Sequence, residues 1–90
     1  MPRGKKPRNC GCRFKGKAFK PVGVPICDVE QVSLSLDELE ALKLCDLDDL
    51  TQEAAGSKMG VSRGTVHRTL AAARKKVAGA LSRGHAIIFE

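Results

Sequence analysis

The sequence predicts a mainly α-helical protein in which three helices follow a loop-rich N-terminal arm. Two kinds of local signal lead to this prediction. Residues suited to helix N-caps stand at Ser35, Thr51 and Ser62, and glycines suited to helix C-caps stand at Gly60 and Gly84. The chain has 90 residues, of which 42% are hydrophobic, and this length accommodates one core. We expect an irregular basic arm over residues 1–27, a folded domain over residues 28–85 and a short tail over residues 86–90.

The arm is predicted to be irregular because residues 1–25 contain four prolines and four glycines without any 3.6-residue hydrophobic period. Short extended pieces are expected only around Phe14 and Phe19. Residues 29–34 alternate weakly and include β-branched side chains, which predicts a short strand before the first helix. Residues 86–89 form a second β-prone segment. These two segments are expected to pair with each other, or the tail with a second chain.

The first helix is predicted to begin at a capping box, in which the Ser35 hydroxyl and the Glu38 carboxylate satisfy backbone N–H groups. It is expected to continue to about Asp46, with one broad apolar face. That face is predicted to consist of Leu36, Leu39, Leu42, Leu44, Cys45 and Leu47. Cys45 is accordingly assigned to the core, where a free cysteine packs as a small hydrophobe.

The second helix is expected to begin after Thr51 and to stop at Gly60, and the third to begin after Ser62. In the third helix, Gly79 costs about 1 kcal/mol relative to alanine, and Gly84 is the expected C-cap. Apolar residues recur there at spacings of three and four, which predicts an amphipathic helix. The predicted buried stripe consists of Val66, Leu70, Ala73, Val77 and Leu81.

Two helices joined by so short a turn are typical of a helix-turn-helix, whose second helix enters the major groove of DNA. Gly56 lies where the two helices are expected to approach closely, and Gly60 lies where the turn needs a residue in the left-handed conformation. Val66 lies where an apolar side chain is expected to anchor the second helix in the core. Arg68 is the candidate for a bidentate contact to guanine, and the residues at the two helix N-termini suit phosphate. The predicted DNA-binding residues are Thr51, Gln52, Ser62, Arg63, Gly64, Thr65, His67, Arg68 and Lys75.

Charge is sorted along the chain, although the net charge is only +6. Residues 1–27 carry eight basic and no acidic side chains, residues 28–58 carry two basic and nine acidic ones, and residues 59–90 carry six basic and one acidic. The two basic blocks favour a polyanionic partner, whereas the middle block should avoid phosphate. The arm is expected to add phosphate contacts. The arm residues predicted to make them are Arg3, Lys5, Lys6 and Arg8.

Composition argues against several other classes of protein. No apolar run approaches the roughly 20 residues of a transmembrane helix, and none follows the basic N-terminus as in a secretory signal peptide. A cytoplasmic location is therefore expected. The chain has no Trp or Tyr for stacking single-stranded bases. An enzyme is not expected, because two histidines without a plausible triad or phosphate loop offer little for catalysis.

The segments LDELEALKL, LTQEAAGSKMGVSRGTVHRTL and ARKKVAGAL, within residues 36–81, resemble uncharacterised protein family 0251, as do the opening MPR and FKPVGVP. The resemblance covers nearly the whole chain. It implies a helix-turn-helix similar to region 4 of sigma-70-like factors, with residues 62–68 in the recognition segment. The chain departs from this family at Gly56, where alanine is usual, and at Val66, where phenylalanine is common. Both changes keep a small or apolar residue.

The four cysteines raise a metal hypothesis, because four thiolates can complete a tetrahedral zinc site. Their spacing is not that of a zinc ribbon, and Cys45 is assigned to the core. A thiolate cluster of Cys10, Cys12 and Cys27, for zinc or for redox sensing, is therefore kept only as an alternative, and no cofactor is expected. Structural disulfides are not expected in a cytoplasmic protein.

The sequence thus predicts a protein that binds double-stranded DNA, regulates transcription and reads the major groove with the helix that begins at Ser62. Homodimerisation is expected only by analogy with proteins that read paired half-sites. One alternative is a protein-interaction module that docks on RNA polymerase or another regulator, which the acidic middle block favours. A second alternative is a regulator that responds to metal or redox state through Cys10, Cys12 and Cys27.

Overall fold

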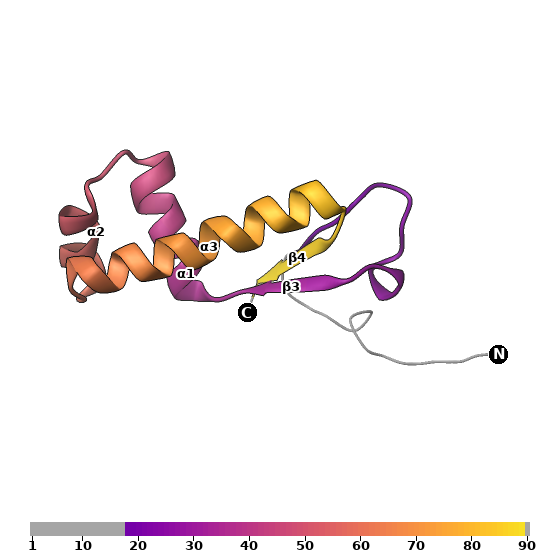
Figure 1. Cartoon of the computed structure of the whole chain (residues 1–90), viewed down its shortest axis with the longest axis horizontal. Coiled ribbons are helices and arrows are strands. Elements are labelled where there is room, and N and C mark those ends of the chain that lie inside the picture. The colour runs from indigo at the N-terminus through magenta and orange to yellow at the C-terminus, as the bar shows by residue number, and fades with distance from the viewer. Residues whose placement is uncertain (1–17, 90) are drawn as a thin grey trace.

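The computed structural model describes residues 18–89, and its helices lie in the order that the sequence predicts. Three α-helices and a small sheet make up this part of the chain (Figure 1). In chain order, the elements are β2 (Ala18–Phe19), the 3-10 helix η2 (Ile26–Asp28), β3 (Gln31–Leu34), α1 (Leu36–Leu42), the π-helical turn η3 (Lys43–Leu47), α2 (Gln52–Met59), α3 (Arg63–Arg83) and β4 (Ala86–Phe89).

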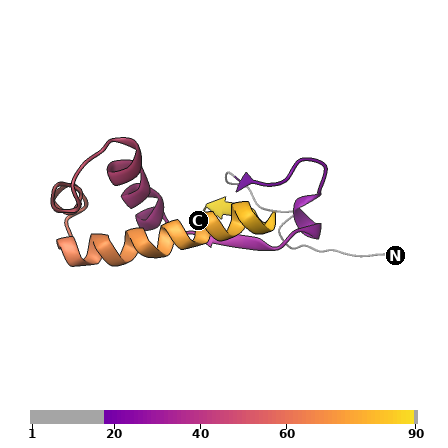
Figure 2. The same cartoon turned by 45° about the horizontal axis from the view of Figure 1, so that its top comes forward.

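Helix α3 is the central element. Both cartoon views show α1 and α2 against its N-terminal half and the strands against its C-terminal half (Figures 1 and 2). Its 21 residues extend over about 30 Å at 1.5 Å per residue. The long helix therefore joins a helical end, which holds the α2–α3 turn, to an end that holds the sheet.

The predicted helix caps are confirmed. Ser35 and Glu38 form the full capping box: the Ser35 hydroxyl accepts from the Glu38 amide at 3.2 Å, and Glu38 Oε1 accepts from the Ser35 amide at 2.9 Å. Thr51 and Ser62 likewise cap α2 and α3 through their hydroxyl oxygens. Side-chain oxygens thus satisfy amides that the first turn of each helix leaves without an intrahelical partner.

The sheet has the order β2–β4–β3, so the last strand in the chain is its middle strand. Strand β4 pairs in parallel with β3, from Gln31 opposite Ala86 to Leu34 opposite Phe89. This confirms the predicted pairing of the tail with the segment before the first helix. Strand β2 comes from the segment expected to be arm, where only an extended piece near Phe19 was predicted, and it pairs antiparallel with β4.

The core consists of two clusters of buried side chains. One contains Leu34, Ala73, Ala80 and Ile87 and lies between α3 and the sheet. The other contains Leu44, Ala55 and Val66 and lies among η3, α2 and α3. Cys45 is half-buried and packs against the second cluster.

The predicted apolar stripe of α3 was wrong at its last position. Leu81 is 75% exposed, whereas Ala80 is buried. Successive residues of a helix are turned by about 100°, so only one of these two neighbours can face the sheet. The sheet packs against the side of α3 that carries Ala73 and Ala80, and this choice leaves Leu81 outside.

The predicted apolar face of the first helix was also wrong in part. Leu36 and Leu47 are 68% and 72% exposed, and Leu39 is also exposed. Glu38 and Ala41 are buried instead, whereas Leu44 is buried as predicted. The helix is rotated so that the face carrying the Glu38 carboxylate, and not the leucine-rich face, lies toward α3.

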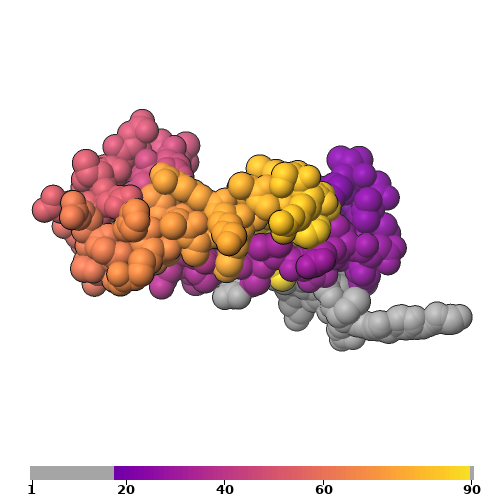
Figure 3. Space-filling model, viewed as in Figure 1, coloured from indigo at the N-terminus to yellow at the C-terminus, as the bar shows by residue number. Residues whose placement is uncertain are grey.

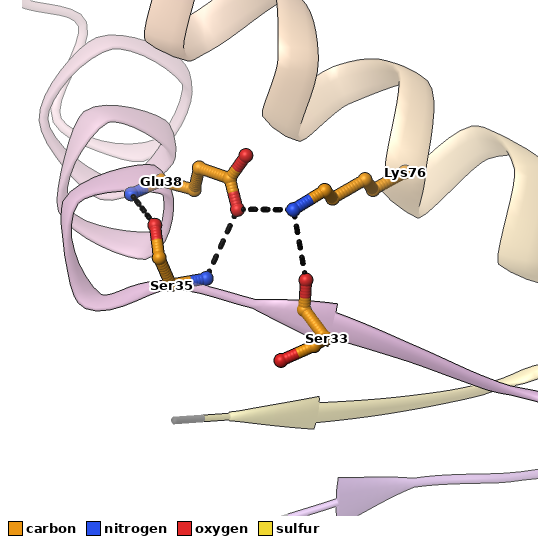
Figure 4. Close-up of polar contacts among 4 residues, drawn as sticks. All are labelled: Ser33, Ser35, Glu38 and Lys76. Carbon is orange, nitrogen blue, oxygen red and sulfur yellow. Dashed lines mark hydrogen bonds and ion pairs between the residues drawn. The ribbon is translucent and has the colours of Figure 1, made fainter.

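A polar cluster explains that rotation. Lys76 Nζ on α3 donates to Glu38 Oε1 at 2.8 Å and to the Ser33 carbonyl oxygen at 2.9 Å (Figure 4). Glu38 Oε1 also accepts from the Ser35 amide, as described above. One lysine therefore connects β3, α1 and α3, and a buried carboxylate of this kind is tolerated because it is paired and hydrogen-bonded.

None of the helices within residues 18–89 combines the length and apolarity needed to cross a bilayer.

Candidate nucleic-acid interface

The α2–α3 turn is tight because two glycines permit it. Gly60 adopts the left-handed conformation, with φ of 75°, and ends α2. The Val61 amide then donates to the Gly56 carbonyl oxygen at 2.9 Å. A Cβ atom on Gly56 would lie only 2.7 Å from the Val61 carbonyl oxygen and 3.4 Å from Val66 Cγ2. The close approach inferred at Gly56 is therefore present, and a side chain there would require the turn to shift.

Val66 fixes the start of α3 beneath this turn. Its side chain is fully buried in the cluster with Ala55 and Leu44. Leu70 and Ala73 continue the buried stripe along the helix. Because this face of α3 is anchored, the opposite face of its first turns is held outward.

The predicted DNA-binding residues lie mostly on that outward face. Within this set, Gln52 and Thr65 are half-buried and the others are exposed. Five of the nine line one surface depression of about 440 Å³ between the first turn of α2 and the start of α3. These five are Gln52, Arg63, Gly64, His67 and Arg68. The structure thus brings together residues from two helices that are predicted to contact the same ligand.

The residues that line the depression belong to α2 and the start of α3, which lie at one end of the described part of the molecule, opposite the end that carries the strands (Figures 1 and 3). Lys75 lies apart from the depression, because it follows Arg68 by two helical turns, or about 10 Å along α3. It borders a different groove, beside the sheet. The structure therefore divides the predicted set: most of it gathers around the α2–α3 turn, and Lys75 does not.

A short chain of hydrogen bonds orients Arg68. Its Nη2 atom donates to Thr65 Oγ1 at 3.3 Å, and Thr65 Oγ1 lies 3.1 Å from Ser62 Oγ. The Thr65 hydroxyl, which was among the predicted DNA-binding groups, supports the arginine in this structure. Sequence spacing alone did not indicate this role, although residues three apart on a helix surface are neighbours.

The charges near the depression are not balanced by carboxylates. Within residues 18–89, neither Arg63 nor Arg68 forms an ion pair. Four acidic side chains of the middle block, Glu30, Glu38, Asp46 and Asp48, instead lie within 4.0 Å of other basic side chains. Arg74 makes a bidentate pair with Asp46, with Arg74 Nη2 2.6 Å from Asp46 Oδ1. The positive charge at the start of α3 is therefore available to an anionic ligand, because neither arginine there is paired with a carboxylate of the described residues.

Two of these ion pairs lower the pKa of a carboxyl group. The hydrogen bonds from Arg74 hold the pKa of Asp46 below its usual value of 3.8. For Glu38, burial acts to raise the pKa, but hydrogen bonds from the Lys76 side chain and the Ser35 backbone outweigh it, so the pKa lies below 4.5. Glu38 has the greater structural importance of the two, because it is the buried one.

These shifts predict acid sensitivity of a defined sign. Groups whose folded-state pKa is lowered stabilise the protein above their unfolded-state pKa, and this contribution is lost as the pH falls through the folded-state value. We expect the free energy of unfolding to decline below about pH 4.5. Urea titrations between about pH 7 and about pH 3 measure this decline. A Glu38→Gln variant should show a shallower decline, and an equal slope in both proteins would contradict the assignment to Glu38.

The family described as "Protein of unknown function DUF134" matches residues 1–90. The chain belongs to this family. A "UPF0251 protein" of Shewanella piezotolerans is 44% identical over 88 residues, which are 98% of this chain and 88% of that protein. The resemblance to family 0251 is thereby confirmed.

Other relatives of this DUF134 protein are longer. A "UPF0251 protein" of Halothermothrix orenii is 51% identical over 72 residues, which are 80% of this chain but 53% of that protein. One of Methanosarcina acetivorans is 55% identical over 69 residues, covering 77% of this chain and 62% of that protein. The chain thus spans less than two thirds of these two relatives. No solved structure matches it.

The bonding of one cysteine of this DUF134 protein, Cys27, differs from the prediction. Cys27 is disulfide-bonded in the structure, so the expectation of reduced thiols was wrong there. That expectation came from the redox state of a compartment, whereas bonding depends on how closely two cysteines approach. A disulfide sulfur is not a thiolate ligand.

Cys10 and Cys12, like the arm residues Arg3, Lys5, Lys6 and Arg8, lie outside the described residues. Among residues 18–89, no three metal-ligating side chains cluster.

Proposed function

We propose that this protein binds double-stranded DNA with the α2–α3 unit and regulates transcription, without a catalytic step of its own. The observation that carries the proposal is the shared depression at the start of α3, where exposed basic side chains from that helix meet the first turn of α2. A recognition helix typically contacts base edges with its N-terminal residues while the preceding helix contacts the backbone. A cytoplasmic location and binding as a homodimer to paired half-sites belong to the same proposal.

In the proposed complex, Arg68 reads a guanine and the helix N-termini bind phosphate. The guanidinium of Arg68 lies on the outward face, supported by Thr65, and its two N–H donors match the O6 and N7 acceptors of guanine. A Cβ atom on Gly64 would contact Arg68 Nη1 at 3.6 Å, so the glycine leaves space beside the guanidinium. Arg63 and the first amides of α3 suit a phosphate, which the helix dipole favours.

The proposal is tested by selecting duplexes from a random library and measuring the anisotropy of the selected duplex and a scrambled one at several salt concentrations. We expect the selected duplex to bind about 10³-fold tighter or more. A selected motif made of two inverted half-sites would support the dimer. Equal and steeply salt-dependent binding of both duplexes would show that positive charge alone is responsible, and would overturn the proposal.

A substitution at Arg68 separates base reading from phosphate binding. Arg68→Ala is expected to reduce the preference for the correct base over the other bases at one position of the site about tenfold, because the bidentate contact is lost. Lys5→Ala, in the basic arm, is the matched control and should weaken all duplexes alike. Competition titrations with single-base variants of the selected duplex measure both effects. Uniform loss of affinity in Arg68→Ala would assign Arg68 to phosphate.

A second candidate function is docking on RNA polymerase or another regulator. One observation favours it: the outer face of α1 and η3 exposes Leu36, Leu39 and Leu47 beside exposed Asp37 and Glu40. Apolar side chains grouped on a surface often mark a protein interface. Retained capture of purified RNA polymerase by a variant that no longer binds duplex DNA would favour this function.

A further inference from the structure

A second depression lies beside the C-terminal half of α3, away from the α2–α3 turn. It is a groove of about 340 Å³ between α3 and the sheet. Its floor is apolar and includes Val32 of β3 and Ala72 and Ala80 of α3. Ligand pockets typically occupy about 300–1,000 Å³ and combine an apolar lining with a few polar groups. The groove has the size for a small ligand, and its floor favours an apolar one.

The sides of this groove carry basic side chains. They come from Lys75, Lys76, Arg83 and His85. Lys76 is paired with Glu38, and His85 Nε2 lies 4.0 Å from Glu30 Oε1. Lys75 and Arg83 are exposed and form no ion pair within residues 18–89. The groove thus combines an apolar floor with two cations that no carboxylate of the described chain neutralises.

Gly79 lines the groove and has no evident structural role. It lies inside α3, where glycine costs about 1 kcal/mol relative to alanine, and its φ is not positive. A Cβ atom there would meet nothing within 4 Å, in contrast to Gly56, where it would meet the turn. Packing within residues 18–89 therefore does not require glycine at this position. A side chain at position 79 would extend into the groove.

We propose that the groove binds a small anionic amphiphile, with its apolar part on the floor and its acidic group beside Lys75 and Arg83. The charge of the groove argues for an anion, and its apolar floor argues against a bare phosphate. A symmetric contact with the same groove of a second copy is disfavoured because it would bring like charges together. The site is independent of the proposed DNA contacts except at Lys75, which it shares with the predicted set.

The test uses the full chain and two probes, 8-anilinonaphthalene-1-sulfonate and octanoate. We expect the fluorescence of the sulfonate to rise and shift to the blue on binding, and octanoate to displace it. The neutral alcohol octanol should compete at least about tenfold less well, which corresponds to about 1.4 kcal/mol. Equal competition by octanol would overturn the role of the cations, and so the proposal.

Two variants that each place a leucine side chain on α3 locate the site. Gly79→Leu is expected to weaken binding of both probes at least about tenfold, because the new side chain fills the groove. The substitution also removes a helix-destabilising glycine, so the protein should still fold. Ala78→Leu adds its side chain at the exposed neighbouring position, about 100° around the helix, and should bind like the parent. Unchanged binding in Gly79→Leu would overturn the proposal.

The charge contribution is tested separately with Arg83→Gln. This variant should lose affinity for octanoate and for the sulfonate about tenfold while its weak affinity for octanol stays the same. An equal loss for octanoate and octanol would mean that the substitution altered the shape of the groove and not its charge. A different outcome is that neither probe binds the parent protein and that Gly79→Leu binds duplex DNA more weakly. That outcome would overturn the proposal and would indicate that the groove contacts a DNA phosphate instead.

Discussion

Replacing Leu70 with alanine is expected to lower the free energy of unfolding by about 3 kcal/mol. Leu70 is 1% exposed and lies on the buried face of α3 between Val66 and Ala73. Truncation there removes apolar contacts and leaves a cavity that the neighbouring helices can fill only in part. Because small domains have about 5–15 kcal/mol of total stability, the loss should be visible as a large shift in the urea midpoint.

Leu81→Ala is the matched control for this prediction. It removes the same atoms from the same helix, but at a position that is 75% exposed, so a change within about 0.5 kcal/mol is expected. Urea denaturation followed by circular dichroism compares the two variants. Similar losses for both would contradict the rotation of α3 described above, in which Ala80 and not Leu81 faces the sheet.

Glu38→Gln is expected to lower the free energy of unfolding by about 2 kcal/mol at neutral pH. Glutamine keeps the neutral hydrogen-bonding part of the capping box, so the substitution chiefly removes the charge that Lys76 pairs with. The Glu38 side chain is only 11% exposed, and the pair is therefore less screened than a surface pair. The variant leaves the partly buried ammonium group of Lys76 with neutral acceptors only, the Ser33 carbonyl oxygen and the glutamine amide oxygen.

Asp48→Asn provides the surface comparison. It removes the ion pair with Lys43, whose side chain is 59% exposed, and should cost no more than about 0.5 kcal/mol. A double-mutant cycle of Glu38→Gln with Lys76→Met measures the coupling between the buried partners. Purely additive effects in that cycle would show that the two residues stabilise the protein independently.

The starts of α1, α2 and α3 and the ends of α2 and α3 were predictable because their signals are local, whereas the change from α1 to the π-helical turn after Leu42 was not predicted. Ser35, Thr51 and Ser62 cap through amides three residues away, and Gly60 and Gly84 end helices through their own backbone conformation. Each of these interactions lies within a few residues of sequence. No knowledge of the rest of the fold was needed to infer them.

The rotation of α1 was not predictable from the same kind of signal. Its leucines outnumber its other apolar residues, and a periodicity argument therefore places them in the core. The pair between Glu38 and Lys76 joins residues 38 apart in the chain, and it turns the acidic side of the helix inward. Likewise, only the position of the sheet decides between Ala80 and Leu81.

The candidate site was predictable as a set of residues but not as a surface. Helical geometry identified the outward positions of α3, and the residues that line the depression were among those named. It did not indicate that Thr65 supports Arg68, or that Lys75 lies beside a different groove. Both facts depend on side-chain conformations and on the neighbouring elements. The groove was not predictable from the sequence, because it is lined by Val32 of β3 and by residues of α3 from Ala72 onward, which are far apart in the chain.

The order of strands in the sheet has a consequence for synthesis on the ribosome. Strands β2 and β3 both pair with β4, the strand that is translated last. Parallel pairing also requires the chain to return across the sheet, and this return includes all three helices. The helical end can therefore assemble from contacts close in sequence, whereas the sheet must wait for residues 86–89 to emerge. Folding of this protein should proceed from the α2–α3 turn outward, with closure of the sheet as the slow, final step.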